Sequence, residues 1–237
     1  MQPLQPISPI KDSILYEDSH ILLCHKKSGI PVQTRKLQEK DLESLLKNYL
    51  AQKNSPNPYL GVINRLDQPV EGIILFAKTK EAAAKLTEQL THHKISKKYL
   101  AITSTPFIPE KGTLQDYLFK DGKQNCSKVV TSDTLGGKPA SLDYQVLSTM
   151  ENHSLVDICL HTGRHHQIRV QLSHAGAPLL GDMKYGGEPA RQLCLCSYFL
   201  AFFHPATGKK LTFCVKPQNP EFQVFSHQIK SAITHSV

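Results

Sequence analysis

Three short blocks of the sequence combine side chains that could support chemistry. Asn64-Arg65-Leu66-Asp67 lies directly before an apolar run, so Asp67 would stand at the rim of a rigid element. A carboxylate in such a place can serve as a nucleophile or a general base. An aspartate in a turn more often satisfies local backbone N–H groups, and the residues alone favour that role.

A second block, Lys97-Lys98-Tyr99, begins a stretch with the pattern of a β-strand. Two lysines beside a tyrosine can contact a phosphate and stack a nucleobase, as in the recognition of single-stranded RNA. The alternative is a pair of solvated lysines at a strand edge, followed by a tyrosine of the core. The residues alone favour this alternative over an RNA contact.

The densest block is HTGRHHQIR at residues 161–169, where the pattern predicts a helix beginning at Thr162. Free N–H groups and the dipole at a helix N-terminus favour anions, and Arg164, His165 and His166 would add donors at the same end. Arg169 would lie one turn further along, where its guanidinium could reach inward to a carboxylate. A basic, solvated helix face would account for the same residues.

The histidines of this block and His174 raise the question of a metal site. No Asp or Glu accompanies them locally, unlike the His-Glu-x-x-His arrangement of zinc enzymes. Cys194 and Cys196 alternate like strand residues and have no further ligands nearby. Nucleotide-binding glycine loops and the Gly-x-Ser-x-Gly elbow are absent. We therefore expect no metal and no cofactor, and a metal-dependent hydrolase is kept as an alternative.

The composition bounds the class of protein. The 237 residues carry a formal net charge of +8, and the sequence pI is near 9.1. A basic balance favours polyanionic partners through counterion release, but it does not distinguish RNA from DNA or acidic lipid. No stretch approaches the roughly 18 apolar residues that span a membrane, and the first residues lack the pattern of a secretory signal. We expect a soluble, cytoplasmic protein with reduced cysteines.

Hydrophobic periodicity predicts the elements that would position these blocks. Helical spacing of apolar residues predicts helices from Asp41, from Lys80 to about Thr91 with Thr79 as N-cap, and from Thr162 to Ala175. Residues 104–137, rich in Gly, Lys, Asp and Pro, would form an insertion or an outlying hairpin. Alternating or continuous apolar runs predict strands at residues 14–16, 21–25, 72–77, 98–103, 142–146, 155–160, 193–203 and 211–215.

Strands and helices do not alternate regularly along the chain. We therefore expect an α+β fold with a mixed, mostly antiparallel central sheet and flanking helices. No shift in composition marks an internal boundary, which predicts one domain over residues 14–225. An N-terminal tail (1–13) and a C-terminal tail (226–237) would flank it.

The three blocks, in this order, resemble the RluA-like family of RNA pseudouridine synthases. Arg65-Leu66-Asp67 matches the family's arginine-leucine-aspartate block, and the apolar stretch Gly72 to Lys78 follows it. Lys97 to Ala101 matches the second block, and Gly163 to Val170 matches the third. The likeness continues in GAPLLGD at residues 176–182, in Tyr185-Gly186 and in FHPATG at residues 203–208.

The resemblance implies the pseudouridine synthase fold and the isomerisation of a uridine within ribosomal or transfer RNA. It makes Asp67 the essential carboxylate, which acts at the sugar as nucleophile or as the base that takes the 2′ proton. Arg169 would pair with Asp67 and keep it ionised. Tyr99 would lie against the flipped base and help remove the C5 proton.

The same resemblance implies how RNA would be held. A base must leave its stack to be reached, and Arg65 would occupy the space that it vacates. Arg164, His165, Lys97 and Lys98 would grip phosphates, contributing affinity more than sequence choice. The protein would act as a monomer on structured RNA, with no membrane, metal or cofactor.

The chain departs from the family pattern around the aspartate. Asn64 stands where the family usually has histidine, and QPVEG at residues 68–72 replaces a small Thr-Ser-Gly stretch. Val70 and Glu71 thus replace small polar residues, and Glu71 would place a negative charge where RNA phosphates approach. An RNA-binding protein that kept the fold and lost the reaction is therefore the main alternative. A basic domain with protein partners is a further one.

Overall fold

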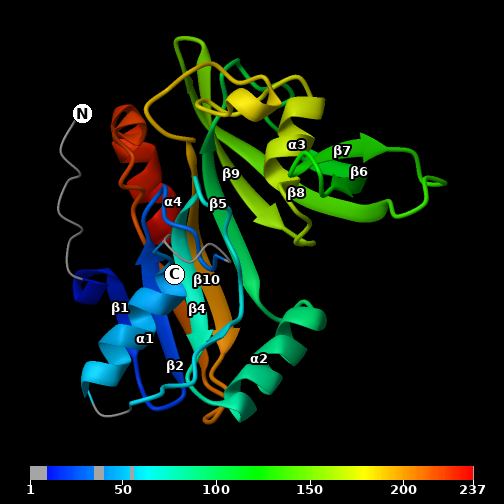
Figure 1. Ribbon diagram of the computed structural model, residues 1–237. Coiled ribbons are helices and arrows are strands. Elements are labelled where there is room, and N and C mark those ends of the chain that lie inside the picture. The colour runs from blue at the N-terminus through cyan, green and yellow to red at the C-terminus, as the bar shows by residue number, and fades with distance from the viewer. Residues whose placement is uncertain (1–9, 35–39, 54–55, 237) are drawn as a thin grey trace, which may run out of the picture. The chain divides into compact units, whose positions relative to one another are not determined.

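The structure is a computed structural model, which describes residues 10–34, 40–53 and 56–236 (Figure 1). The chain divides into two compact units. Unit 1 comprises Met1–Lys94 and Phe202–Leu211, and unit 2 comprises Ile95–Ala201 and Thr212–Val237. Most of the expected N-terminal tail lies outside the described residues, while Ile10–Ser13 forms a 3₁₀ helix, η1. The single domain over residues 14–225 stays a prediction.

Unit 1 is built on an antiparallel sheet. Its elements are β1 (Ile14–Glu17), β2 (Ile21–Lys26), α1 (Leu42–Lys53), β3 (Gly61–Val62), β4 (Glu71–Ala77) and α2 (Lys80–Thr91). β2 pairs with β1 on one side and with β4 on the other, and β3 pairs with β4. Every residue of β4 is buried, as its continuous apolar run predicts. Strand β4 is therefore a rigid support for the residues that precede it.

Helix α2 begins as the sequence predicts and holds the late stretch FHPATG. Thr79 Oγ1 accepts a hydrogen bond of 3.1 Å from Ala82 N, which confirms Thr79 as the N-cap. Farther along, Lys85 Nζ donates to Pro205 O at 2.9 Å, and Gln89 Nε2 donates to Phe203 O at 2.7 Å. These contacts fasten residues 203–205 to the exposed side of α2.

Unit 2 contains a longer antiparallel sheet, with the strand order β10-β5-β9-β8-β6-β7. Its strands are β5 (Ser96–Ile102), β6 (Lys111–Asp121), β7 (Cys126–Val130), β8 (Lys138–Met150), β9 (His153–Leu160) and most of β10 (Leu195–Phe203) and β11 (Lys210–Cys214). The last two residues of β10 and the first two of β11 belong to unit 1. Its helices are α3 (Gln167–His174), η2 (Met183–Tyr185), η3 (Pro220–Phe225) and α4 (Ser226–Ser236).

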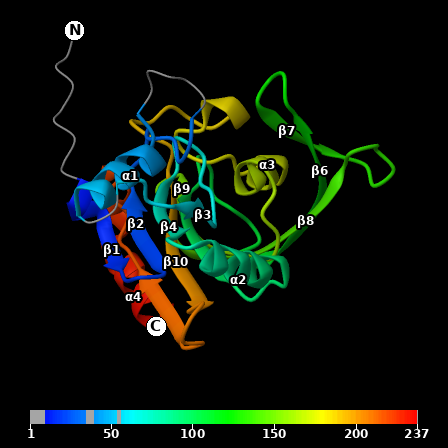
Figure 2. The same ribbon diagram turned by 60° about the horizontal axis from the view of Figure 1, so that its bottom comes forward.

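The predicted outlying hairpin is present as β6 and β7, and it supports α3. β6 pairs with both β7 and β8. Leu118 of β6, Ala140 of β8 and Val170 of α3 form a small buried cluster. Figures 1 and 2 both show α3 beside β6 and β7. The hairpin is thus part of the framework that positions α3.

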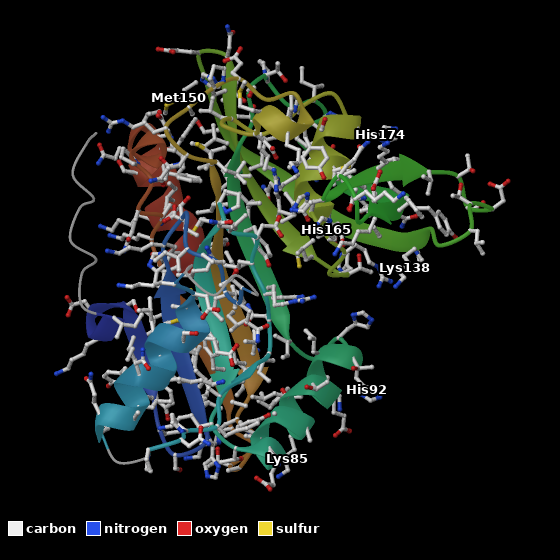
Figure 3. All side chains as sticks on the ribbon, viewed as in Figure 1. Lys85, His92, Lys138, Met150, His165 and His174 are labelled. Atoms are coloured by element: carbon white, nitrogen blue, oxygen red, sulfur yellow. The ribbon has the colours of Figure 1, made fainter. Side chains whose placement is uncertain are left out.

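Two helices differ from the sequence prediction. α3 begins at Gln167 rather than Thr162, because His166 adopts a left-handed conformation (φ 54°) that a helix cannot contain. Figure 3 labels His165 and His174 near its two ends. The expected anion site at a helix start on residue 162 is therefore replaced by a turn. Residues 226–236, expected as a tail, form α4, whose Ile229 is buried.

Both units combine helices with antiparallel strands. The predicted α+β class with a mostly antiparallel sheet is therefore confirmed. Within the part of the chain that the structure describes, every helix is too short or too polar to cross a lipid bilayer.

Candidate active site

Asp67 lies in a turn that leads into β4. A hydrogen bond of 3.0 Å from Val70 N to Asp67 O closes this turn. The Asp67 side chain is half-buried, and that of Arg65, two residues earlier, is exposed. The carboxylate therefore stands at the rim of a buried strand, as the sequence predicts.

Asn64 fixes the segment on the N-terminal side of the turn. β3 pairs with the end of β4, and Ile63 N extends the ladder by donating to Leu75 O at 3.0 Å. The buried Asn64 amide then takes the place of strand backbone, donating to Ile73 O at 3.0 Å and accepting from Leu75 N at 2.7 Å. The chain can thus leave the sheet toward Asp67 while these groups of β4 stay hydrogen-bonded.

A buried lysine holds the C-terminal side of the turn. Lys26 Nζ donates to the carbonyl oxygens of Lys27, Ile30 and Gln68 at 3.0, 2.7 and 2.9 Å. An ammonium group has three N–H donors, so all of them are used. Burial lowers the pKa of Lys26 to about 8, and the charge of Asp67 opposes that shift. Lys26 thus joins the loop after β2 to the turn and adds positive charge near Asp67.

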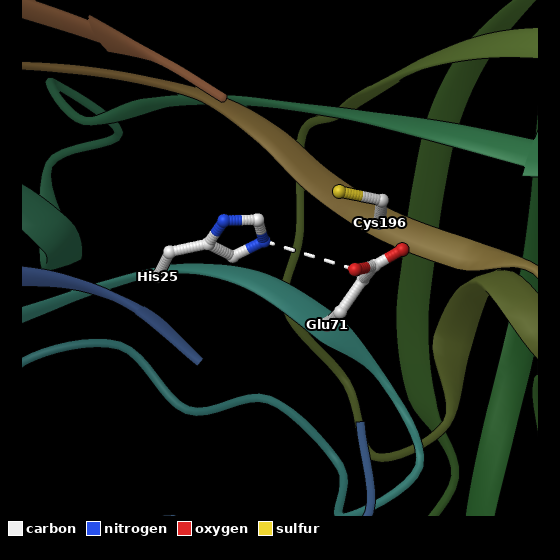
Figure 4. Close-up of side chains that lie close together, drawn as sticks. All are labelled: His25, Glu71 and Cys196. Carbon is white, nitrogen blue, oxygen red and sulfur yellow. Dashed lines mark ion pairs between the residues drawn. The ribbon is translucent and has the colours of Figure 1, made fainter. Parts of the chain in front are cut away.

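Two residues that depart from the family pattern, Val70 and Glu71, are buried in the core. Val70 and Glu71 are 2% and 3% exposed, so the expectation that Glu71 faces RNA phosphates is wrong. His25 Nε2 lies 3.8 Å from Glu71 Oε2 (Figure 4). Burial, and then the lysine charges nearby, lower the pKa of His25 to about 4. The ring is therefore neutral at pH 7, and the contact is polar rather than ionic.

In unit 2, Lys97 and Lys98 lie on opposite faces of β5, because side chains alternate along a strand. Lys97 shares its face with Tyr99, and its Nζ lies 3.5 Å from where a Cβ on Gly163 would stand. Burial lowers the pKa of Lys97. Lys98 Nζ instead donates to Ser236 Oγ of α4 at 3.3 Å. Of the two lysines, Lys97 is the one that approaches the turn before α3.

Gln167 organises that turn. Its Oε1 accepts from Thr162 Oγ1 at 2.8 Å and from Arg164 N at 3.0 Å, while its Nε2 donates to Ser141 O at 3.1 Å. Arg164 Nε donates to Pro139 O at 2.9 Å. The turn is therefore fastened to β8, and it holds the half-buried Arg164 side chain at a defined position.

Ser127 of β7 and Tyr185 of η2 fix the two histidines of the turn. Ser127 Oγ donates to His165 O at 2.8 Å, so we assign His165 Nδ1, 2.9 Å away, as the donor to that hydroxyl. Tyr185 Oη accepts from Ser127 N at 2.8 Å and forms a second hydrogen bond of 2.7 Å with His166 Nδ1. Burial, and then the charge of Arg169, lower the pKa of His166 to about 3, and this ring is neutral.

Arg169 forms a buried ion pair with Asp182. Its Nε and Nη2 donate to the two carboxylate oxygens, each at 2.7 Å. Its Cζ also lies 5.0 Å from the centroid of the Tyr185 ring. The guanidinium is therefore held along one edge by Asp182 and on one face by Tyr185.

The structure brings part of the predicted set together. Arg164 and His165 lie in the turn before α3, and Arg169 follows on its first helical turn. Asp67 and Arg65 belong to unit 1, whereas Arg169 belongs to unit 2. The pairing of Asp67 with Arg169 therefore stays a prediction.

Four residues of these frameworks received no role from the sequence: Lys26, Ser127, Asp182 and Tyr185. Asp182 and Tyr185 lie in the stretch GDMKYG, whose likeness to the family pattern was the available signal. Lys26 ends an apolar strand, and a lysine there is ordinarily solvated, so its burial has no local signature.

The chain is similar to known RNA pseudouridine synthases. A family model described as RNA pseudouridylate synthase matches residues 20–174, more than half of the chain. Ribosomal large subunit pseudouridine synthase C of Buchnera aphidicola is 30% identical over 237 residues, which covers 96% of this chain and 74% of the relative. Ribosomal large subunit pseudouridine synthase D of Pseudomonas aeruginosa is 35% identical over 221 residues, covering 85% of this chain and 67% of the relative.

Solved structures share the fold. The structure titled human RNA pseudouridylate synthase domain containing 4 matches with a TM-score of 0.76 at 24% identity, covering 93% of this chain and 94% of that one. The structure titled human RNA pseudouridylate synthase domain containing 1 matches with a TM-score of 0.74 at 21% identity. At such identities the likeness concerns the fold alone.

Proposed function

Because this chain belongs to the RluA-like family of RNA pseudouridine synthases, we propose that it isomerises uridines of large-subunit ribosomal RNA. The observation that carries the proposal is the family match over residues 20–174, which includes Asp67, Tyr99 and Arg169. Two relatives that cover most of this chain are named for the large ribosomal subunit, which favours ribosomal over transfer RNA. The protein acts as a monomer in the cytoplasm.

The reaction breaks the bond between uracil N1 and C1′, turns the base and joins C5 to C1′. N1 gains a proton and C5 loses one, so the composition of the nucleotide does not change. Asp67 acts at the sugar, as the nucleophile at C1′ or as the base that takes the 2′ proton. The supports from Asn64 and Lys26 favour this role, because a carboxylate on a loop fixed at both ends keeps one orientation.

Arg169 and Tyr99 complete the proposed catalytic set. Arg169 is the proposed ion-pair partner of Asp67, and the two-bond contact with Asp182 leaves its Nη1 available for that role. Tyr99, buried on β5, lies against the flipped uracil, and its hydroxyl helps remove the C5 proton.

The basic side chains hold the RNA in this proposal. Lys97, Arg164 and His165 contact phosphates, which favours binding of any RNA backbone. The exposed Arg65 fills the space left by the everted nucleotide. Lys98 lies on the other face of β5, so it contributes through its charge at longer range.

Release of tritium from C5-labelled RNA tests the proposal, because joining C5 to C1′ expels the C5 hydrogen. We expect the wild type to release tritium from large-subunit ribosomal RNA, and Asp67→Ala to release it at least about a thousandfold more slowly. Asp12→Asn, an exposed aspartate of the same unit, is the matched control and should act like the wild type. Release from transfer RNA alone would overturn the substrate assignment, and full activity of Asp67→Ala would overturn the role of that carboxylate.

A further inference from the structure

The pair of Arg169 with Asp182 is almost completely removed from water. Arg169 is 6% exposed and Asp182 is 2% exposed. Removing two charges from water costs free energy that their attraction only partly returns, so a buried pair of this kind adds little to stability. What the pair does supply is geometry, because two parallel N–H···O bonds fix the plane and direction of the guanidinium.

Asp182 can fix Arg169 because its own loop is closely packed. Asp182 N donates to Leu179 O at 3.0 Å, and Asp182 O accepts from Gly187 N at 2.9 Å. A Cβ on Gly187 would lie 1.9 Å from Leu179 O, and one on Gly181 would lie 2.2 Å from Gln192 O. Both positions therefore require glycine, and the backbone segments approach too closely to slide.

Tyr185 restrains the guanidinium from a second side. Its ring covers the Cζ of Arg169 at 5.0 Å, a contact in the range of a cation–π interaction. Its hydroxyl is anchored by the hydrogen bonds to Ser127 N and His166 Nδ1. The ring therefore cannot turn away unless hydrogen bonds to β7 and to the turn before α3 are broken.

We propose that Asp182 and Tyr185 are positioning residues of the reaction, which fix the guanidinium of Arg169 in the orientation that catalysis requires. This inference rests on the proposed function, since it takes Arg169 to act on Asp67. Asp182 contacts the guanidinium along the edge formed by Nε and Nη2, so Nη1 points away from the Asp182 carboxylate. A displacement of a catalytic group by about 1 Å can lower the reaction rate by about a hundredfold.

The test is the kinetic split of Asp182→Asn on large-subunit ribosomal RNA from cells that lack the protein. The amide keeps the size of the side chain but turns an N–H group toward a guanidinium donor, which breaks the two-bond fork. We expect kcat to fall about 10- to 100-fold while KM changes by less than about threefold. Tyr185→Phe keeps the ring and loses the anchor, so we expect a smaller loss of kcat, about three- to tenfold.

Asp157→Asn is the matched control. Asp157 is a half-buried carboxylate of β9 in the same unit, and it accepts a hydrogen bond of 3.1 Å from Tyr198 Oη. We expect this variant to keep kcat within about twofold of the wild type. Circular dichroism and thermal melting establish the folded fraction of every variant, so that kcat refers to folded enzyme.

A second measurement does not depend on activity. In the ¹⁵N-correlated NMR spectrum, the Nε–H of Arg169 should exchange slowly with solvent in the wild type and faster in Asp182→Asn. Unchanged kcat or unchanged exchange in Asp182→Asn would overturn the inference. If the wild type is active, Asp67→Ala is inactive and Asp182→Asn is fully active, the inference fails while the proposed function stands. An inactive, folded wild type would overturn both.

Discussion

Replacing Asn64 by alanine tests how the chain leaves β4 toward Asp67. The change removes the donor to Ile73 O and the acceptor from Leu75 N, two buried backbone groups. A buried group left without a partner costs about 1–3 kcal/mol, so the two together cost about 2–6 kcal/mol. A water molecule that enters the space of the deleted amide would lower this cost, and we expect a loss of about 3 kcal/mol.

Urea unfolding followed by circular dichroism measures this loss, and thermal melting gives a second value. For a chain of this length, about 3 kcal/mol corresponds to a decrease in melting temperature of about 6–12 °C. Asn57→Ala is the matched control, because Asn57 is exposed in the same unit and should change stability by less than about 0.5 kcal/mol. Asn64→Asp should be at least as damaging as alanine, since it sets a carboxylate oxygen against Ile73 O.

Activity should fall along with stability in Asn64→Ala, because the segment that carries Asp67 loses one of its two supports. We expect kcat to fall about tenfold in the folded enzyme. A stability within about 0.5 kcal/mol of the wild type would contradict this role of Asn64. Such a result would mean that the hydrogen bonds of the Asn64 amide to Ile73 O and Leu75 N do not stabilise this edge of β4.

Three further predictions concern the framework. Thr79→Ala should cost about 1 kcal/mol of stability in urea unfolding, because α2 loses its N-cap to Ala82 N. Gly187→Ala should lower the melting temperature by several degrees, because its Cβ would lie 1.9 Å from Leu179 O. In a chain of this length, each kcal/mol of lost stability corresponds to about 2–4 °C. The pKa of His25 is about 4 in the fold and about 6.5 when unfolded, so the unfolded state binds more protons between these values. The wild type should therefore lose stability as the pH falls through this window, and His25→Gln should lose less, as measured by urea midpoints at about pH 7 and 4.5.

Local features of the fold follow from the sequence where a short pattern determines them. The continuous apolar run of β4 and the N-cap at Thr79 depend on neighbours along the chain, and both predictions are confirmed. The start of α3 depends on a left-handed residue, His166, and on the side-chain bonds of Gln167, which compete with helical hydrogen bonds. Helix propensity alone does not predict this competition between side-chain and helical hydrogen bonds.

The candidate site was predictable as a set of residue types more than as a set of contacts. Arg169 was expected to meet a carboxylate, but its described partner, Asp182, lies 13 positions along the chain in a loop without periodic pattern. The opposite faces of Lys97 and Lys98 follow from strand alternation, yet their partners come from distant segments. The burial of Lys26 depends on three carbonyl groups that only the folded chain assembles.

We propose that Asp67 carries the formation of pseudouridine in large-subunit ribosomal RNA. The most direct measurement is a pseudouridine map of that RNA from cells lacking the gene, complemented with the wild type or with Asp67→Asn. We expect one or more positions that are uridine without the gene, pseudouridine with the wild type, and uridine again with Asp67→Asn. Pseudouridine restored to the same level by Asp67→Asn, or a map that never changes, would contradict this proposal.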